Sequence, residues 1–210
     1  ETTGLQSPGI LANSSMVIRD SQITSSASES IQLRGGNTLT LNNTFLTSTQ
    51  DRKWGVLLTQ GASGNNDSGS ALLDIAEGEI IFKSTKGSMF YVTNTTAEIK
   101  LFKTILTNSS PNLLTASSIT ESEQVGTFGG NVTLRVSNQV LVGNIIVDNL
   151  STIDVYLTDS SSYEGTINQE KSAKSFNLEL DSTSTLTLTG DSYINGITGL
   201  DISRIRVDNV

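Results

Sequence analysis

Hydrophobic and polar residues alternate along much of the chain, and the alternation returns at a nearly fixed interval. In the second half, apolar residues occupy every other position in four short stretches. This period of two predicts β-strands with one buried face and one exposed face. The apolar positions are Val132, Leu134 and Val136, then Ile153, Val155 and Leu157, then Phe176, Leu178 and Leu180, and finally Leu200 and Ile202.

Successive stretches are related by one repeat length. Leu134, Leu157, Leu180 and Ile202 follow one another at nearly equal steps, and their numbers rise by 23, 23 and 22. In the first half, pairs of apolar residues again lie 23 positions apart: Met16 and Leu39, Ile18 and Leu41, and Ile23 and Leu46. A fixed period of this length is the signature of a repeat architecture.

Two longer intervals predict insertions in the repeat. From Leu41 the next equivalents are Ile75 and Leu101, so the numbering rises by 34 and then by 26. The first long step coincides with residues 61–70, GASGNNDSGS, and a second loop-like stretch covers residues 107–130. We therefore expect one elongated domain over residues 1–210 with loop insertions at these two places.

The repeat predicts an all-β fold, a right-handed parallel β-helix of about nine coils with 22–24 residues each. Leucine-rich repeats share the period but need a consensus and a helical return that are missing here, and propeller blades are longer. Corners of such coils favour residues that adopt left-handed conformations or supply side-chain acceptors, as Asn43, Asn94, Asn138, Asp148 and Asp181 can. Asp20 and Asn43 stand one repeat apart, a spacing that allows a stacked polar ladder, and ordinary turn residues are the alternative that we favour for most of these positions.

Composition removes several classes of chemistry. Of the 210 residues none is Cys or His, which excludes Ser-His-Asp and Cys-His nucleophiles, His- or Cys-bound zinc and iron–sulfur clusters. The net charge of −8 argues against nucleic acid or an anionic membrane as a partner, whereas calcium remains compatible. No apolar run approaches a membrane-spanning length, and the chain begins without a signal-like segment. We expect a mature, soluble piece without membrane insertion.

Three segments carry a family resemblance: MFYVTNTTAEIKL at 89–101, GNVTLRVSNQVLVGNIIVDNLS at 130–151 and FNLELDSTSTLTLTGDSYINGI at 176–197. They, and the coil start at Lys53 to Val56, resemble secreted bacterial right-handed parallel β-helix proteins of the clostridial polysaccharide-binding, adhesin-like type. The resemblance implies a non-catalytic, calcium-containing protein, secreted or at the cell surface, that binds polysaccharide, including acidic sugars. It assigns no ligand residue to a position in this chain.

The residues themselves suggest one carbohydrate site. Trp54, the only Trp, follows Asp51, Arg52 and Lys53 at the start of a coil. An aromatic face beside Arg and Lys is suited to stacking on a sugar ring and pairing with a uronate carboxylate. The alternative is that Trp54 packs against a coil turn and has no ligand.

Candidate calcium ligands lie in two places. Asn65, Asn66 and Asp67 bring side-chain oxygens into the inserted loop, although an ordinary solvated turn has the same composition. Asp159 and Asp181 are one repeat apart, so neighbouring coils are expected to bring them close enough to favour a cation. Solvated corners are the alternative for this pair.

Three other functions compete with glycan binding. Strand edges at the coil ends allow a surface stalk or an adhesin or filament element that assembles end to end. Parallel β-helices also host polysaccharide lyases and hydrolases, but no enzyme motif surrounds the six Arg residues, so we expect no catalysis. Ice binding would need regular Thr ranks, and Thr183, Thr185, Thr187 and Thr189 are not repeated one coil earlier.

Overall fold

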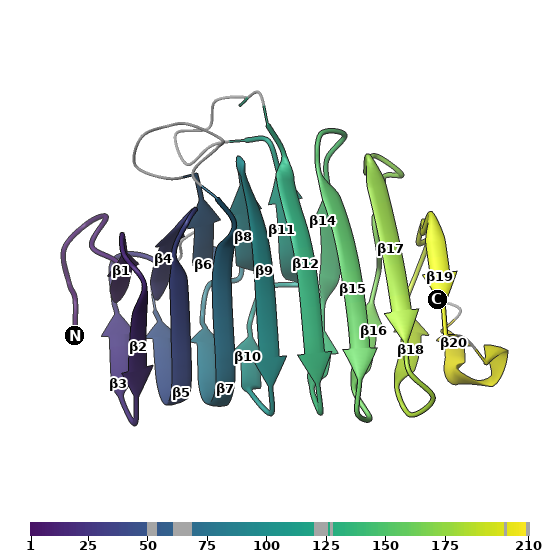
Figure 1. Cartoon of the computed structure of the whole chain (residues 1–210), viewed down its shortest axis with the longest axis horizontal. Coiled ribbons are helices and arrows are strands. Elements are labelled where there is room, and N and C mark those ends of the chain that lie inside the picture. The colour runs from purple at the N-terminus through teal and green to yellow at the C-terminus, as the bar shows by residue number, and fades with distance from the viewer. Residues whose placement is uncertain (50–53, 61–68, 120–125, 127, 200, 209–210) are drawn as a thin grey trace.

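The computed structural model of the chain is built almost entirely from parallel β-strands (Figure 1). It describes residues 1–49, 54–60, 69–119, 126, 128–199 and 201–208. Within these residues the only helix is a short 3-10 segment, η1 (Ile202–Arg204). No helix in this part of the chain has the length and apolar character needed to cross a bilayer.

A ten-stranded parallel sheet, called sheet A, runs the length of the molecule. Its strands are β19 (Gly196–Thr198), β17 (Ser175–Leu180), β15 (Thr152–Thr158), β12 (Gly130–Ser137), β9 (Thr95–Phe102), β7 (Ala71–Phe82), β5 (Thr38–Ser48) and β2 (Met16–Arg19), with β3 (Gln22–Ser25) beside β5 and β10 (Ile105–Asn108) beside β7. The long strands β5 and β7 bend where Asn43 and Gly78 adopt positive φ. Their second halves therefore pair with β3 and β10.

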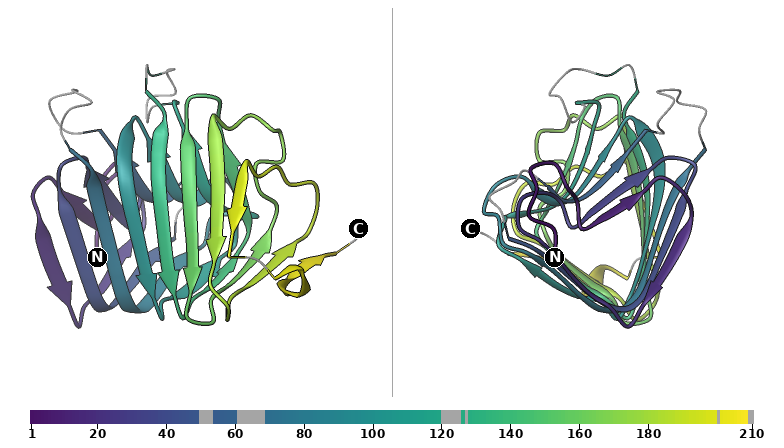
Figure 2. Two further views of the ribbon diagram at one scale, coloured as in Figure 1. Left: turned by 45° about the vertical axis from the view of Figure 1, so that its right-hand side comes forward. Right: turned by 90° about the vertical axis from the view of Figure 1, so that its left-hand side faces the viewer.

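Two smaller parallel sheets cover the remaining sides. Sheet B contains β1 (Ile10–Ala12), β4 (Ile31–Arg34), β6 (Trp54–Thr59), β8 (Ser88–Thr93), β11 (Asn112–Ser117) and β14 (Asn144–Val147). Sheet C contains β13 (Val140–Val142), β16 (Ser162–Gly165), β18 (Thr185–Leu188) and β20 (Ile205–Val207). Viewed along the long axis, the sheets line a roughly triangular outline (Figure 2, right).

Alternation explains both the strands and the core. Along β15 every second residue is buried, and Ile153, Val155 and Leu157 point inward while Asp154 and Tyr156 point outward. The same alternation in β9, β12 and β17 stacks Leu, Ile, Val and Phe into one core between the sheets. Outward positions need only tolerate extended backbone, which accounts for many of the Thr residues.

The predicted repeat is largely confirmed by the strand register. Leu39 pairs with Met16, Leu46 with Ile23, and Leu180 with Leu157. The two irregular steps are also confirmed, because Leu41 pairs with Ile75 and Ile75 with Leu101. The repeat length therefore equals the number of residues between positions that are paired in adjacent strands.

Two of the predicted steps are wrong. Leu134 pairs with Val155 rather than Leu157, and Leu178 pairs with Ile197 while Ile202 lies in η1. A shift of two positions leaves every side chain on the same face of a strand, so the apolar pattern does not distinguish the two registers.

The second insertion is shorter than predicted. Residues 107–108 belong to β10, and β11 occupies 112–117 within the stretch expected to be a loop. Leu113 and Leu114 are both buried, next to an irregularity in the pairing of β11 with β14. Two consecutive buried residues hide the period of two, which explains the missed strand. The first insertion, at 61–70, lies mostly outside the described residues.

Polar corners take the predicted form. Asp20, Asn43, Asn94 and Asn138 all have positive φ, and the Asn43 side chain donates a hydrogen bond of 2.9 Å to Asp20 Oδ1. Asn and Asp tolerate the left-handed region better than other non-glycine residues. The polar ladder that the repeat spacing allows between Asp20 and Asn43 is therefore present.

Asp148 is the acceptor that fastens the turn after β14. Its carboxylate accepts hydrogen bonds from the amides of Ser118 and Leu150 and from the hydroxyls of Ser117, Ser118 and Ser151. Burial raises the pKa of this carboxyl, but the hydrogen bonds outweigh burial and leave the pKa below its usual value. Asp148 thereby ties the chain after β11 to the turn before β15.

Replacing Asp148 is expected to weaken this connection. Because an amide keeps only one acceptor oxygen, Asp148→Asn should lower the free energy of unfolding by roughly 2 kcal/mol at pH 7, measured by urea denaturation. A folded pKa below the unfolded value means that the stabilisation is present above the unfolded pKa and is lost as pH falls through the folded pKa. The difference from wild type should therefore shrink below about pH 4. Asp191→Asn, at an exposed position, is the control; equal losses for the two variants would contradict the assignment.

Candidate functional site

Trp54, the aromatic residue predicted to stack on a sugar, lies at the start of β6 in sheet B. Its ring is half-buried and packs against Tyr91, with 4.7 Å between ring centroids and 31° between the planes. The other members of the predicted site, Asp51, Arg52 and Lys53, lie outside the described residues. In the part described, Trp54 joins another aromatic side chain rather than a group of polar ones.

Of the predicted calcium ligands, some lie outside the described residues and others lie within them. Asn65, Asn66 and Asp67 lie outside the described residues, whereas Asp159 and Asp181 meet at one corner. Asp181 Oδ2 accepts a hydrogen bond of 2.7 Å from the Asp159 amide, and Asp159 Oδ2 accepts one of 2.6 Å from the Ser137 hydroxyl. Both carboxylates thus bond to the chain itself.

The electrostatics of this corner reflect the same bonds. Desolvation raises the pKa of Asp181, but the hydrogen bonds from Asp159, Thr183 and Ser184 outweigh it and hold the pKa well below its usual range. Across the described residues no group of three or more acidic side chains is placed to hold a metal ion. The two residues meet through the Asp159 backbone amide, which donates to the Asp181 carboxylate.

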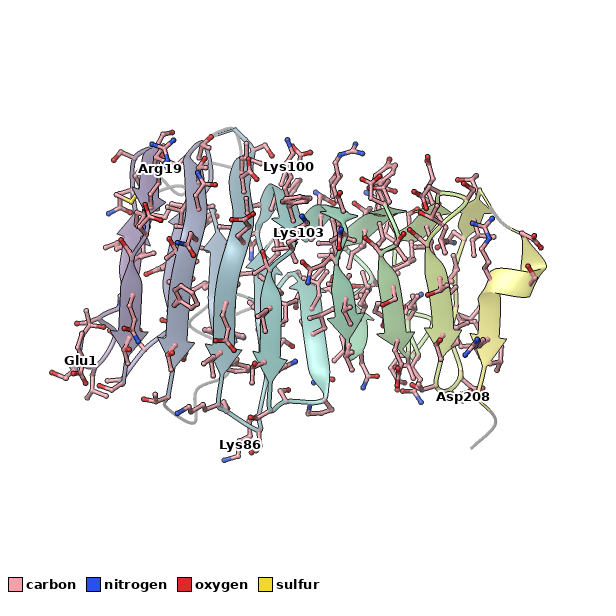
Figure 3. The ribbon with its side chains drawn as sticks, turned by 90° about the horizontal axis from the view of Figure 1, so that it is seen from below. Glu1, Arg19, Lys86, Lys100, Lys103 and Asp208 are labelled. Atoms are coloured by element: carbon pink, nitrogen blue, oxygen red, sulfur yellow. The ribbon has the colours of Figure 1, made fainter. Side chains whose placement is uncertain are left out.

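The outward face of sheet A collects a different set of side chains. Strand register places five outward residues side by side across neighbouring strands: Asp74 on β7, Lys100 on β9, Arg135 on β12, Tyr156 on β15 and Glu179 on β17. Adjacent strands are about 4.8 Å apart, so this row crosses the strands nearly at right angles. Figure 3 marks Lys100 in the middle of the molecule.

Arg135 is held at the centre of this row. Its Nε lies 3.1 Å from Glu98 Oε1, and the same oxygen lies 3.6 Å from Lys100 Nζ. The guanidinium stacks over the ring of Tyr156, with 4.0 Å between the guanidinium carbon and the ring centroid. Among the residues that the structure describes, no acceptor bonds the two terminal nitrogens of Arg135. The group is therefore oriented by the protein and keeps its paired donors available.

Two hollows open along the row. The larger, of about 300 Å³, is lined by Asp74, Lys100, Leu101, Phe102, Arg135, Val136, Ser137, Tyr156 and Thr158. The smaller, of about 140 Å³, is lined by Asp154, Val155, Tyr156, Asn177, Leu178, Glu179, Gly196 and Thr198. Tyr156 lines both hollows, so they form one strip across β7, β9, β12, β15, β17 and β19. We call this strip the sheet-A strip.

The strip combines the groups that recognise sugars in water. Phe102, 39% exposed, and Tyr156 offer the parts of their rings that Lys103 and Arg135 leave uncovered, and Arg135 and Lys100 offer charged donors. Asp74, Ser137 and Thr158 can accept or donate hydrogen bonds to hydroxyl groups. Shallow, open hollows aligned across several strands suit an extended chain better than an isolated small molecule.

Sequence reasoning did not find this strip. Arg135 and Tyr156 could be read as outward residues, because each stands between inward apolar neighbours. Their contact depends on strand pairing across a step shorter than the predicted repeat, whereas Lys100 and Arg135 pair across a step much longer than it. Neither step follows from the repeat length.

Comparison with known proteins returned no relatives. No family model, no curated protein and no solved structure matches the chain. The geometry of the strip is therefore the basis for assigning a function.

Proposed function

We propose that this protein is a non-catalytic carbohydrate-binding module that holds a polysaccharide along the sheet-A strip. The observation that carries the proposal is the arrangement around Arg135, which Glu98 and the Tyr156 ring orient beside Lys100 in a hollow of about 300 Å³. A guanidinium with two available nitrogens pairs well with a carboxylate, so a uronate-containing chain is the preferred ligand.

The fold supports an extended ligand. We infer that the three parallel sheets form a right-handed parallel β-helix, since nearly all connections between parallel strands are right-handed. In such a fold a polysaccharide that runs along the long axis crosses one strand after another and meets Phe102, Arg135 and Tyr156 in turn. The proposal places the protein outside the cell or at its surface, where such polymers occur.

Direct binding tests the proposal. Calorimetric titration with polygalacturonate and with neutral cellulose oligomers should give heat of binding with polygalacturonate, in the presence of calcium and of a chelator in separate runs. Loss of binding with the chelator would identify calcium as part of the complex. Release of unsaturated or reducing sugar ends during the titration would contradict the proposal and identify the protein as a lyase or hydrolase.

A variant pair localises the binding. Arg135→Ala should weaken binding of polygalacturonate at least about 10-fold, because a hydrogen-bonded charge pair contributes about 1.5–3 kcal/mol. Arg206→Ala removes an exposed arginine of the same charge from β20 in sheet C and should leave the affinity unchanged. Equal losses of affinity in both variants would indicate nonspecific electrostatic attraction. If the wild-type protein bound neither glycan, a structural surface element would become the favoured function.

A further inference from the structure

Charged side chains are distributed unevenly along the sheet-A strip. Among the described residues, the larger hollow is lined by two cations, Lys100 and Arg135, and by one carboxylate, Asp74, at its β7 end. The smaller hollow is lined by two carboxylates, Asp154 and Glu179, and by no Lys or Arg of the described chain. The larger hollow therefore offers cationic donors to a ligand, whereas the charged groups of the smaller hollow are all hydrogen-bond acceptors.

The larger hollow is suited to one carboxylate of a ligand. Glu98 Oε1 lies 3.1 Å from Arg135 Nε and 3.6 Å from Lys100 Nζ, so one carboxylate oxygen orients both cations. This geometry leaves the two terminal nitrogens of Arg135 available for a paired bond to a ligand carboxylate. Asp74 stands beside Lys100 on the neighbouring strand and would repel a second ligand carboxylate there.

The smaller hollow is suited to a neutral sugar. Asp154 Oδ1 accepts a hydrogen bond of 2.8 Å from Asn177 Nδ2. Neither Asp154 nor Glu179 forms an ion pair with any residue in the described ranges. A carboxylate accepts hydrogen bonds from hydroxyl groups, so both side chains can bind an uncharged sugar, whereas a ligand carboxylate would meet two like charges without a cation between them.

The strand register separates the two kinds of site. Arg135 pairs with Tyr156, and Tyr156 pairs with Glu179, so Arg135 and Glu179 lie two strands apart. Two strand spacings amount to about 10 Å, which is close to the Debye length at 0.1 M salt. A ligand carboxylate at Arg135 is therefore largely screened from Glu179, whereas a carboxylate above the smaller hollow lies directly beside Glu179.

We propose that the sheet-A strip selects polysaccharides in which acidic and neutral sugars are interspersed, with a uronate in the larger hollow and a neutral sugar in the smaller one. This inference rests on the proposed function, because it assigns the two hollows to different sugars of one bound glycan. Arg135 binds the uronate carboxylate through its terminal nitrogens. Asp154 and Glu179 accept hydrogen bonds from hydroxyl groups of the neutral sugar. A polymer made only of uronates is then a weaker ligand.

Oligogalacturonides of one length and graded methyl esterification are the probes. A methyl ester removes the charge of a sugar and keeps its ring and hydroxyl groups. Calorimetric titration should give the tightest binding for an oligomer with interspersed free and esterified sugars. The unesterified oligomer should bind at least about 5-fold more weakly, because its carboxylates meet the like charges of the smaller hollow. The fully esterified oligomer should bind at least about 10-fold more weakly, because Arg135 then has no carboxylate to bind.

A matched pair of variants assigns the preference to the smaller hollow. Glu179→Gln removes one of its carboxylates and should reduce the preference for the mixed oligomer over the unesterified one by at least about 3-fold. Glu164→Gln removes the same charge from an outward position of β16 in sheet C and should leave this preference unchanged. Both side chains are exposed, so neither substitution disturbs the core.

The titrations separate failure of this inference from failure of the proposed function. Tightest binding of the unesterified oligomer would overturn the inference and leave the glycan-binding module in place. Equal changes of preference in Glu179→Gln and Glu164→Gln would also overturn it, because the smaller hollow would then have no special part in selection. Absence of binding to every oligomer would contradict the proposed function itself, and the inference with it.

Discussion

Phe82→Ala is expected to lower the free energy of unfolding by about 3–5 kcal/mol, the range for removing a fully buried aromatic side chain. Phe82 ends β7 and is completely buried in the core. Its ring lies against the backbone of β6 so closely that a Cβ on Gly55 would come within 3.0 Å of it. The substitution would therefore leave unfilled space between sheet A and sheet B.

Urea denaturation of wild type and variant measures this loss. Phe45→Ala is the matched control, because Phe45 lies in the same half of β5 but points outward and is 43% exposed. The control should cost less than about 1 kcal/mol, in proportion to the apolar area it buries. Similar losses for the two variants would mean that the core is not packed at Phe82 as described.

Gly78→Ala is expected to cost about 3 kcal/mol for a different reason. Gly78 has φ of +84° at the bend of β7, in the region that favours glycine. A Cβ there would clash with Thr44 O and stand 2.6 Å from Thr44 N, and both atoms belong to the backbone of the paired strand β5. Backbone strain and the clash add, because neither strand can move without breaking its ladder.

Gly190→Ala is the control variant for Gly78→Ala. Gly190 has no positive φ, and a Cβ there would meet only the Thr166 methyl group, at 3.2 Å. Gly190→Ala should therefore change the free energy of unfolding by less than about 1 kcal/mol, since a side chain can give way. If Gly78→Ala were equally mild, the bend of β7 would have to be looser than the structure shows.

Gly78 also shows why the bend of β7 could not be predicted from the sequence. The motif Glu77-Gly78 interrupts an otherwise regular alternation, and glycine inside a strand pattern can mark either a bulge or a bend. Only the pairing of Thr44 with Gly78 shows that both strands turn together. That shared turn lets the second half of β5 pair with β3 and the second half of β7 pair with β10.

The sequence by itself determined the all-β fold, the inward residues of most strands and the spacing of several paired strands. These features follow from a local rule, because a buried face requires an apolar residue at every second position. The ladder of Asp20 and Asn43 was predictable for the same reason, since both residues satisfy a corner conformation that recurs at the repeat length.

Tertiary structure decided which outward residues meet. The contact of Arg135 with Tyr156 depends on a register that differs by two positions from the predicted one, and the pairing of Lys100 with Arg135 depends on the length of the chain between β9 and β12. The hydrophobic pattern is the same in either register, so it carries no information about these contacts. Outward neighbours are selected by the stacking of whole strands, and that is why the candidate sites became visible only in the folded molecule.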